Sequence, residues 1–334
     1  MTNDFKETQR NRQMAWRKTN ISTMKYGFHN GERYAHVVPR LNWKENLWAG
    51  IREELPEYIS ARNIQAHTGT NNLLSSWVNC ANLYFPVRII PDFRRLMIDF
   101  LKTKLKTDVI SINAVELEFA FEGDLSPSAL LGEAGGRRGS SQTSPDVALL
   151  VTTKNGPGIV LIESKYTEHS FYACSARRSK GSAKRPANPD ISRCMRPAAE
   201  CDYRQICHQT VWGRRYWDHL TLTEAGKQSL KRCPAATSGY QLFRQQSLAE
   251  GIAASGQFAL VISAVAYDLR NTALIRSGRS SGVGDFRTDW GELFRGKAQF
   301  HTWPHQEWVD FVKNHSRDRQ TGQWAEYQNL RYGY

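Results

Sequence analysis

Residues 144–167 constrain the fold of this chain more than any other stretch. They contain two apolar segments, residues 144–151 and 158–167, which are separated by the turn-forming sequence Lys-Asn-Gly-Pro-Gly. Both segments are rich in Val, Ile and Leu, and runs of this kind bounded by Gly and Pro are typical of buried strands. We therefore predict two adjacent strands that pair through the turn.

Three charged side chains interrupt this apolar pair: Asp146, Glu163 and Lys165. Because side chains alternate across a strand, Glu163 and Lys165 share one face while Ser164 points away. Pairing of the strands would bring Asp146 close to both. Two carboxylates and a lysine at the end of a buried hairpin need compensation, and a divalent cation bound to the carboxylates would provide it. The alternative is a buried ion pair without a catalytic role.

Pro145-Asp146, followed by Glu163-Ser164-Lys165, resembles the PD-(D/E)xK signature of nucleases with a restriction endonuclease-like fold. The resemblance implies an α/β core in which helices flank a mixed central sheet. It also implies that Asp146, Glu163 and the backbone carbonyl of Ser164 bind Mg²⁺ or Mn²⁺. Lys165 would then orient the attacking water and favour its hydroxide form.

Further segments resemble a family of bacterial restriction endonuclease-like proteins, from about residue 71 to residues 303–308. They are residues 74–76, 82–86, 163–168 and 239–245. Within the last, Gln-Leu-Phe-Arg-Gln resembles the QLxxY motif of the RecB-like branch, although Gln245 stands where Tyr is usual. Gln241 and Gln245 share a helical face and would steady a metal-bound water or a phosphate. The alternative is an exposed polar face.

Nucleases of this fold commonly add an acidic residue upstream of the motif Asp. We expect Glu133 to have this role, because a Gly-rich loop entering the strand can bring it to the metal. Glu118, on the preceding strand, is the rival candidate. A solvated surface carboxylate is the alternative for either residue.

The chain of 334 residues has a formal net charge of +13, which suits a polyanionic partner such as nucleic acid. A basic loop follows the motif directly. We expect it to neutralise phosphates, and its alternative is a solvated surface loop. The loop residues are Arg177, Arg178, Lys180, Lys184 and Arg185.

The six cysteines occur without a secretory leader in residues 1–20, so reduced thiols or metal ligands are expected rather than disulfides. Cys174, Cys194, Cys201 and Cys207 cluster in the sequence. A structural zinc or iron–sulfur site at these four is an option without support from spacing, because no CxxC pair is present. Ordinary thiols are the alternative.

We expect residues 1–65 to form an N-terminal arm and helical extension, with residues 1–40 loosely structured. Residues 66–334 would form the nuclease domain with its basic loop inserts. Further elements follow from the periodicity of the apolar residues. We expect helices at 42–61, 71–85, 91–106, 203–220, 240–254 and 290–311, and strands at 109–121 and 258–267.

These features predict a cytoplasmic, Mg²⁺-dependent DNA endonuclease in restriction or anti-phage defence, acting on double-stranded DNA. No apolar run is long enough to span a bilayer. A second copy of the chain or another defence protein is a further candidate partner. Two alternatives remain open: a non-cleaving nucleic-acid-binding protein that keeps the fold, and an RNA-cleaving or partner-activated effector nuclease.

Overall fold

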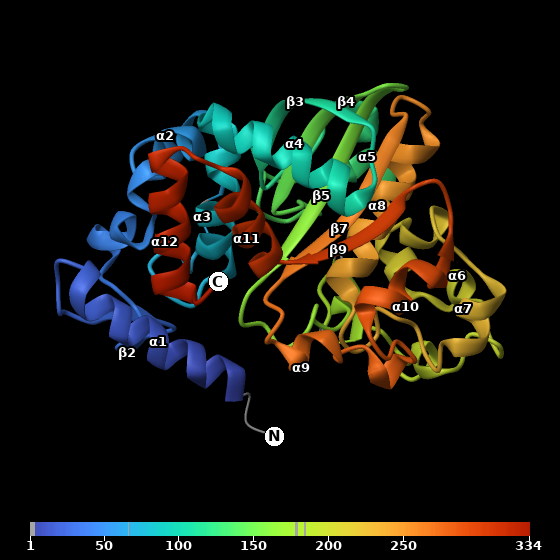
Figure 1. The fold of residues 1–334 in the computed structure, drawn as a ribbon. Coiled ribbons are helices and arrows are strands. Elements are labelled where there is room, and N and C mark those ends of the chain that lie inside the picture. The colour runs from blue at the N-terminus through green and yellow to red at the C-terminus, as the bar shows by residue number, and fades with distance from the viewer. Residues whose placement is uncertain (1–3, 66, 178–179, 184) are drawn as a thin grey trace.

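The computed structural model describes residues 4–65, 67–177, 180–183 and 185–334, and a five-stranded mixed sheet forms the centre of this described part (Figure 1). The strand order is β3-β4-β5-β7-β9. The first three strands are antiparallel, and β5, β7 and β9 are parallel. Helices flank the sheet, which confirms the predicted fold class. The strands are β3 (Val109–Leu117), β4 (Val147–Thr153), β5 (Gly156–Lys165), β7 (Leu260–Tyr267) and β9 (Gln299–Pro304).

The predicted hairpin is present as β4 and β5. Its register runs from Val147 opposite Ile162 to Thr153 opposite Gly156, so two residues form the turn. Gly156 has a φ of 129°, which an L side chain rarely adopts, and this explains why glycine follows the turn. The second strand begins earlier than the apolar run suggested.

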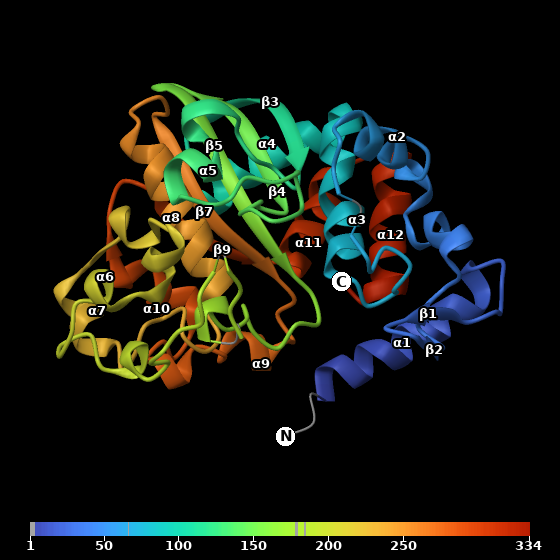
Figure 2. The ribbon, with the colours of Figure 1, turned by 180° about the vertical axis from the view of Figure 1, so that it is seen from behind.

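Alternation along β5 supplies both sides of the sheet with apolar side chains. Val160 and Ile162 pack in one core, and Ile159 and Leu161 pack in the other. Burial of each such side chain contributes about 1.5–3 kcal/mol relative to exposure. The first core is covered by α3 (Ser76–Ile89), α4 (Pro91–Leu105) and α11 (His305–His315), and the second by α5 (Pro127–Leu131) and α8 (Tyr240–Ala254) (Figures 1 and 2).

The expectation that residues 1–40 are loosely structured was wrong for residues 4–20 and for the hairpin that follows. Residues Asp4–Asn20 form α1, which packs beside the C-terminal helix α12 (Arg319–Tyr332) (Figure 1). The buried face of α1 carries Gln9, Gln13 and Arg17 besides Trp16, so it lacks the apolar stripe that identifies a helix. A short hairpin of β1 (Gly27–His29) and β2 (Glu32–Tyr34) follows.

The helix expected at 42–61 is shorter in the structure. Only α2 (Glu54–Ala61) is α-helical, and Pro56 lies in its first turn, where a missing N–H is tolerated. Leu47, Ile51 and Leu55 nevertheless belong to the same core as α3 and α4. The N-terminal segment therefore shares its hydrophobic core with the sheet.

Two other expectations were wrong. Residues 203–220 form α6 (Tyr203–Ile206) and short 3₁₀ segments, and residues 290–311 contain β9 between two helices. The helices expected at 71–85, 91–106 and 240–254 are confirmed as α3, α4 and α8, with α3 shifted and running through Pro86. The remaining elements are β6 (Thr221–Leu222), α7 (Glu224–Ser229), α9 (Thr272–Ile275), α10 (Phe286–Leu293) and β8 (Phe294–Arg295).

Among the described helices, we find none with both the length and the apolar character needed to cross a lipid bilayer.

Candidate active site

A pocket of about 290 Å³ lies at the end of the β4–β5 hairpin. Asp146 immediately precedes β4, and Glu163 and Lys165 end β5, so the hairpin brings the three motif residues to one place. Helix α8, which covers this side of the sheet, contributes further polar groups. The other lining side chains include His67, Trp77, Glu118, Gln142, Thr143, Glu168, Tyr172, Gln241, Arg244 and Gln245.

Hydrogen bonds tie the motif residues to one another. The Nζ atom of Lys165 donates to Oε1 of Glu163 at 2.6 Å, as expected for alternate residues on one strand face. The backbone N–H of Ser164 donates to Oδ2 of Asp146, also at 2.6 Å. Glu163 and Lys165 are only 6% and 3% exposed, so their charges interact with little screening by water.

The carboxylates in the pocket make one another harder to ionise. Burial, together with the nearby charge of Glu163, raises the pKa of Asp146 well above its usual range. The same causes raise the pKa of Glu118 to about 8. Burial opposes protonation of Lys165, but Glu163, Glu168 and Asp146 more than offset it and raise the pKa of that ammonium. The site therefore holds a protonated lysine among crowded acids.

Glu118, the rival candidate, lies in this pocket. It follows β3 directly, and its backbone N–H donates to the carbonyl oxygen of Asp146 at 3.0 Å. Its φ of 48° is uncommon for a residue other than glycine, and such strain often occurs at functional sites. The carboxylate is thus held beside the motif Asp by the end of the sheet.

Glu133, our first choice, is engaged elsewhere. Its carboxylate pairs with Arg244 at 3.0 Å and accepts hydrogen bonds from the hydroxyl groups of Thr143 and Tyr216. It lines a neighbouring cavity of about 240 Å³ rather than the motif pocket. The structure thus brings Glu118, and not Glu133, together with Asp146, Glu163 and Lys165.

Gln241 and Gln245, the two glutamines of α8 considered above, differ in their surroundings. Gln241 lines the pocket, and its buried Oε1 atom has no hydrogen-bond partner among the described residues. Gln245 donates to the carbonyl oxygens of Leu161 and Ala264, so it ties the helix to the sheet. The Oε1 atom of Gln245 is likewise buried without a hydrogen-bond partner among the described residues, so the two residues differ in that only Gln245 is tied to the sheet.

The basic loop is only partly available to a ligand. Arg177 donates to the carbonyl oxygens of Ala236 and Ile191 and is half-buried. Lys180 and Arg185 are exposed, and Arg185 lines the cavity that holds Glu133 and Arg244. Arg178 and Lys184 lie outside the described residues.

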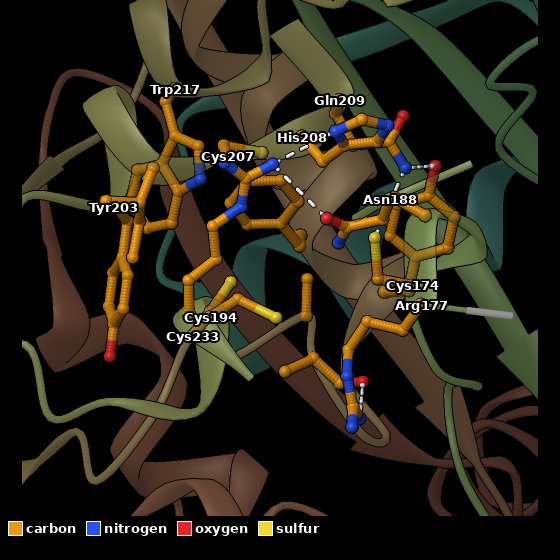
Figure 3. Close-up of a pocket in the computed structure, with 17 residues that line it drawn as sticks. Cys174, Arg177, Asn188, Cys194, Tyr203, Cys207, His208, Gln209, Trp217 and Cys233 are labelled. Carbon is orange, nitrogen blue, oxygen red and sulfur yellow. Dashed lines mark hydrogen bonds between the residues drawn. The ribbon is translucent and has the colours of Figure 1, made fainter. Parts of the chain in front are cut away.

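The cysteines give no support for the metal site considered above. Cys174, Cys194 and Cys207 line an apolar cavity of about 30 Å³ together with Cys233, while Cys201 is not part of its lining (Figure 3). Cys174 accepts a hydrogen bond from Gln209 at 3.2 Å, and Cys201 donates to the Pro197 carbonyl. Burial raises the pKa of Cys174, Cys207 and Cys233, which makes these thiols less reactive.

In residues 4–65, 67–177, 180–183 and 185–334, no group of three or more His, Cys, Asp or Glu side chains is arranged to hold a metal ion. Asp146 and Glu163, the pair expected from the motif, line one pocket and offer carboxylate oxygens. A cation there would need a further ligand, such as the backbone carbonyl of Ser164 or water.

A comparison with known families decides the classification. The family model described as "Restriction Endonuclease associating with ARP" matches residues 10–333. The chain belongs to this restriction endonuclease family. Its match runs from α1 to α12, so the N-terminal helix and the sheet lie within one family unit. Membership of a restriction endonuclease family supports a nuclease role for the chain. No curated protein and no solved structure matches it.

Proposed function

We propose that this chain is a metal-dependent DNA endonuclease of the PD-(D/E)xK type, acting in restriction or anti-phage defence. The observation that carries the proposal is the meeting of Asp146, Glu163 and Lys165 in one pocket at the end of a buried hairpin. Membership of a restriction endonuclease family and a net charge of +13 support it. Double-stranded DNA is the first substrate to test.

The residues present fit a divalent cation. Asp146 and Glu163 offer carboxylate oxygens, the ligands that Mg²⁺ and Mn²⁺ prefer, and the Ser164 carbonyl is adjacent in sequence. Burial, and then the charge of Glu163, raises the pKa of Asp146 and of Glu118. When bound, the cation would neutralise this charge and stabilise the negative charge that develops on the scissile phosphate.

Four residues in or beside the pocket would have separate roles in the reaction. Lys165 is protonated, so it would donate a hydrogen bond to the attacking water or a phosphate oxygen rather than remove a proton. The Ser164 N–H fixes the orientation of Asp146. Gln241, which lines the pocket, would orient the attacking water. Glu118 would add negative charge to the metal-binding side of the pocket.

The test is incubation of the purified chain with plasmid, linear duplex DNA and RNA, each with Mg²⁺ and with EDTA. We expect Mg²⁺-dependent cleavage of DNA that EDTA abolishes. Cleavage of RNA but not of DNA would identify RNA as the substrate. Tight binding of DNA without cleavage of any substrate would contradict the enzymatic proposal.

The family description names an association with ARP. We therefore also propose that the chain works with a partner protein, and the same incubations are repeated with the purified partner. Cleavage that appears only in its presence would assign activation to the complex.

A further inference from the structure

A large cleft adjoins the catalytic pocket. Its volume is about 960 Å³, and it shares His67, Ser76, Glu168 and Tyr172 with the pocket that holds the motif residues. Its other walls come from the start of α1, the segment before α3 and the region of α9. A linear ligand whose reacting group lay at Glu163 would therefore continue into this cleft.

Tyr172 lies at the junction of the two cavities. The residue is 43% exposed and lines both cavities. Its φ of 58° is an outlier for a bulky residue. The backbone is held there on both sides, since the Tyr172 N–H donates to the Ser170 hydroxyl and the Tyr172 carbonyl accepts from the Tyr240 N–H. The surrounding structure thus maintains a strained backbone that leaves an aromatic ring exposed beside the catalytic residues.

The cleft suits the backbone of a nucleic acid. Lys6 of α1 lines it, as do the exposed Arg276 and Arg279 near α9, and cationic side chains of this kind contact phosphates. Three histidines, His29, His67 and His169, also line the cleft, together with the acidic side chains of Asp4 and Glu168. Aromatic rings in a basic groove are the general means by which single strands are bound without sequence readout.

The catalytic groups are recessed, because Glu163 and Lys165 are almost fully buried at the base of their pocket. A flexible single strand can bend a phosphate into such a recess more easily than a stiff duplex can. We propose that the cleft binds one unpaired nucleic-acid strand and that Tyr172 stacks on the base next to the scissile phosphate. This inference rests on the proposed nuclease function and specifies the form of its substrate at the cut. Duplex DNA would then be cut where a base is unpaired, as at a nick, a flap or a distorted step.

Binding is measured first, by anisotropy of labelled single-stranded and duplex DNA of equal length, in an Asp146→Asn background that keeps the DNA intact. Tyr172→Ala should bind the single strand about 5- to 150-fold more weakly, the range for loss of one base–aromatic stack. Tyr172→Phe keeps the ring and should bind as the parent does. Tyr172→Asn removes the ring with a residue that tolerates positive φ, so it replaces the Ala variant if that one melts early. Tyr26→Ala is the matched control, because Tyr26 is 52% exposed and lines neither cavity.

Unchanged single-strand affinity in both Tyr172→Ala and Tyr172→Asn would overturn the inference, and so would equal losses in Tyr172→Phe and Tyr172→Ala. Cleavage separates this inference from the proposed function. If the wild-type chain cuts neither DNA nor RNA with Mg²⁺, alone or with the partner protein, the nuclease proposal fails whatever Tyr172 does. If the wild type cuts gapped DNA and Tyr172→Ala cuts it with an unchanged KM, the inference about Tyr172 alone fails.

Discussion

The backbone N–H of Ser164 donates a 2.6 Å hydrogen bond to the Asp146 carboxylate. This contact continues the antiparallel register of the hairpin, in which Val147 faces Ile162, and it joins the residue before β4 to the end of β5. A slip of one residue in that register would turn Glu163 and Lys165 to the opposite face of the sheet. The pairing of two apolar strands therefore determines whether the charged residues meet.

The crowding of carboxylates predicts a pH-dependent stability for the metal-free protein. The pKa of Glu118 is raised to about 8 in the folded chain, so the folded state keeps a proton that the unfolded chain has released. Stability should then fall as pH rises, by up to about 1.4 kcal/mol per pH unit. We predict that in EDTA the wild type loses more stability between about pH 6.5 and 8 than Glu118→Gln does.

The measurement is denaturant unfolding of both proteins at the two pH values, repeated with Mg²⁺. A bound cation would favour the ionised carboxylates, so Mg²⁺ should reduce the loss in the wild type. If the wild type and Glu118→Gln lost the same stability between the two pH values in EDTA, Glu118 would not be the cause of the pH dependence.

Glu118 and Glu133 should respond differently to the same change. Glu133→Gln breaks a buried ion pair with Arg244 and should lower stability by about 3–5 kcal/mol, while Mg²⁺-dependent cleavage well below the melting temperature persists. Glu118→Gln removes a carboxylate that is hard to ionise, so it should reduce cleavage without loss of stability. Unfolding and plasmid cleavage are measured for both variants. If Glu133→Gln lost cleavage without loss of stability and Glu118→Gln kept cleavage, Glu133 would be the additional acidic residue of the site.

The basic loop should contribute to affinity through Lys180 and Arg185 alone among its described residues. Changing both to Ser should weaken DNA binding and reduce the slope of log K against log salt by about two units, roughly 0.9 per phosphate contact. Arg177 is left intact because it binds backbone carbonyls. The matched control changes the exposed Lys18 and Lys102, and slopes that are equal in the two double variants would place the loop outside the interface.

Arg331 should be a main attachment of α1 to the body. It is fully buried and donates to Gln13 of α1, the hydroxyl of Tyr327 and the backbone carbonyl of Asn46. Arg331→Ala leaves several buried acceptors without a donor, each costing about 1–3 kcal/mol. Arg319→Ala, at an exposed position of the same helix, should change stability by less than about 0.5 kcal/mol. Similar melting temperatures for the two variants would contradict this account.

Local patterns were enough to predict the hairpin and the meeting of its charges. Asp146 precedes one apolar strand, and Glu163 and Lys165 end the next. Period-two alternation and a tight turn then bring the three residues together. Helices α4 and α8 were likewise predicted with bounds close to those observed. In each of these elements the apolar period and the flanking Gly or Pro agree.

The features that sequence patterns missed, or ranked second as with Glu118, depend on distant partners. Helix α1 buries polar residues against α12, and that pairing has no local signal. Glu118 reaches the pocket because its backbone turns to positive φ beside Asp146, a conformation that tertiary contacts impose. Tyr172 was missed altogether, because it lies next to Phe171 four residues after Glu168 and no local pattern sets it apart.

The central claim concerns Asp146, and Asp146→Asn tests it most directly. The amide oxygen can still accept the Ser164 hydrogen bond, so the melting temperature in EDTA should stay close to that of the wild type. The lost charge should abolish metal binding and reduce Mg²⁺-dependent plasmid cleavage by roughly 100-fold or more. Both quantities are measured on the same two preparations. A variant that cuts DNA as fast as the wild type would contradict the catalytic assignment. The assignment would also be contradicted if the variant melted at a far lower temperature and the wild type showed no cleavage with Mg²⁺.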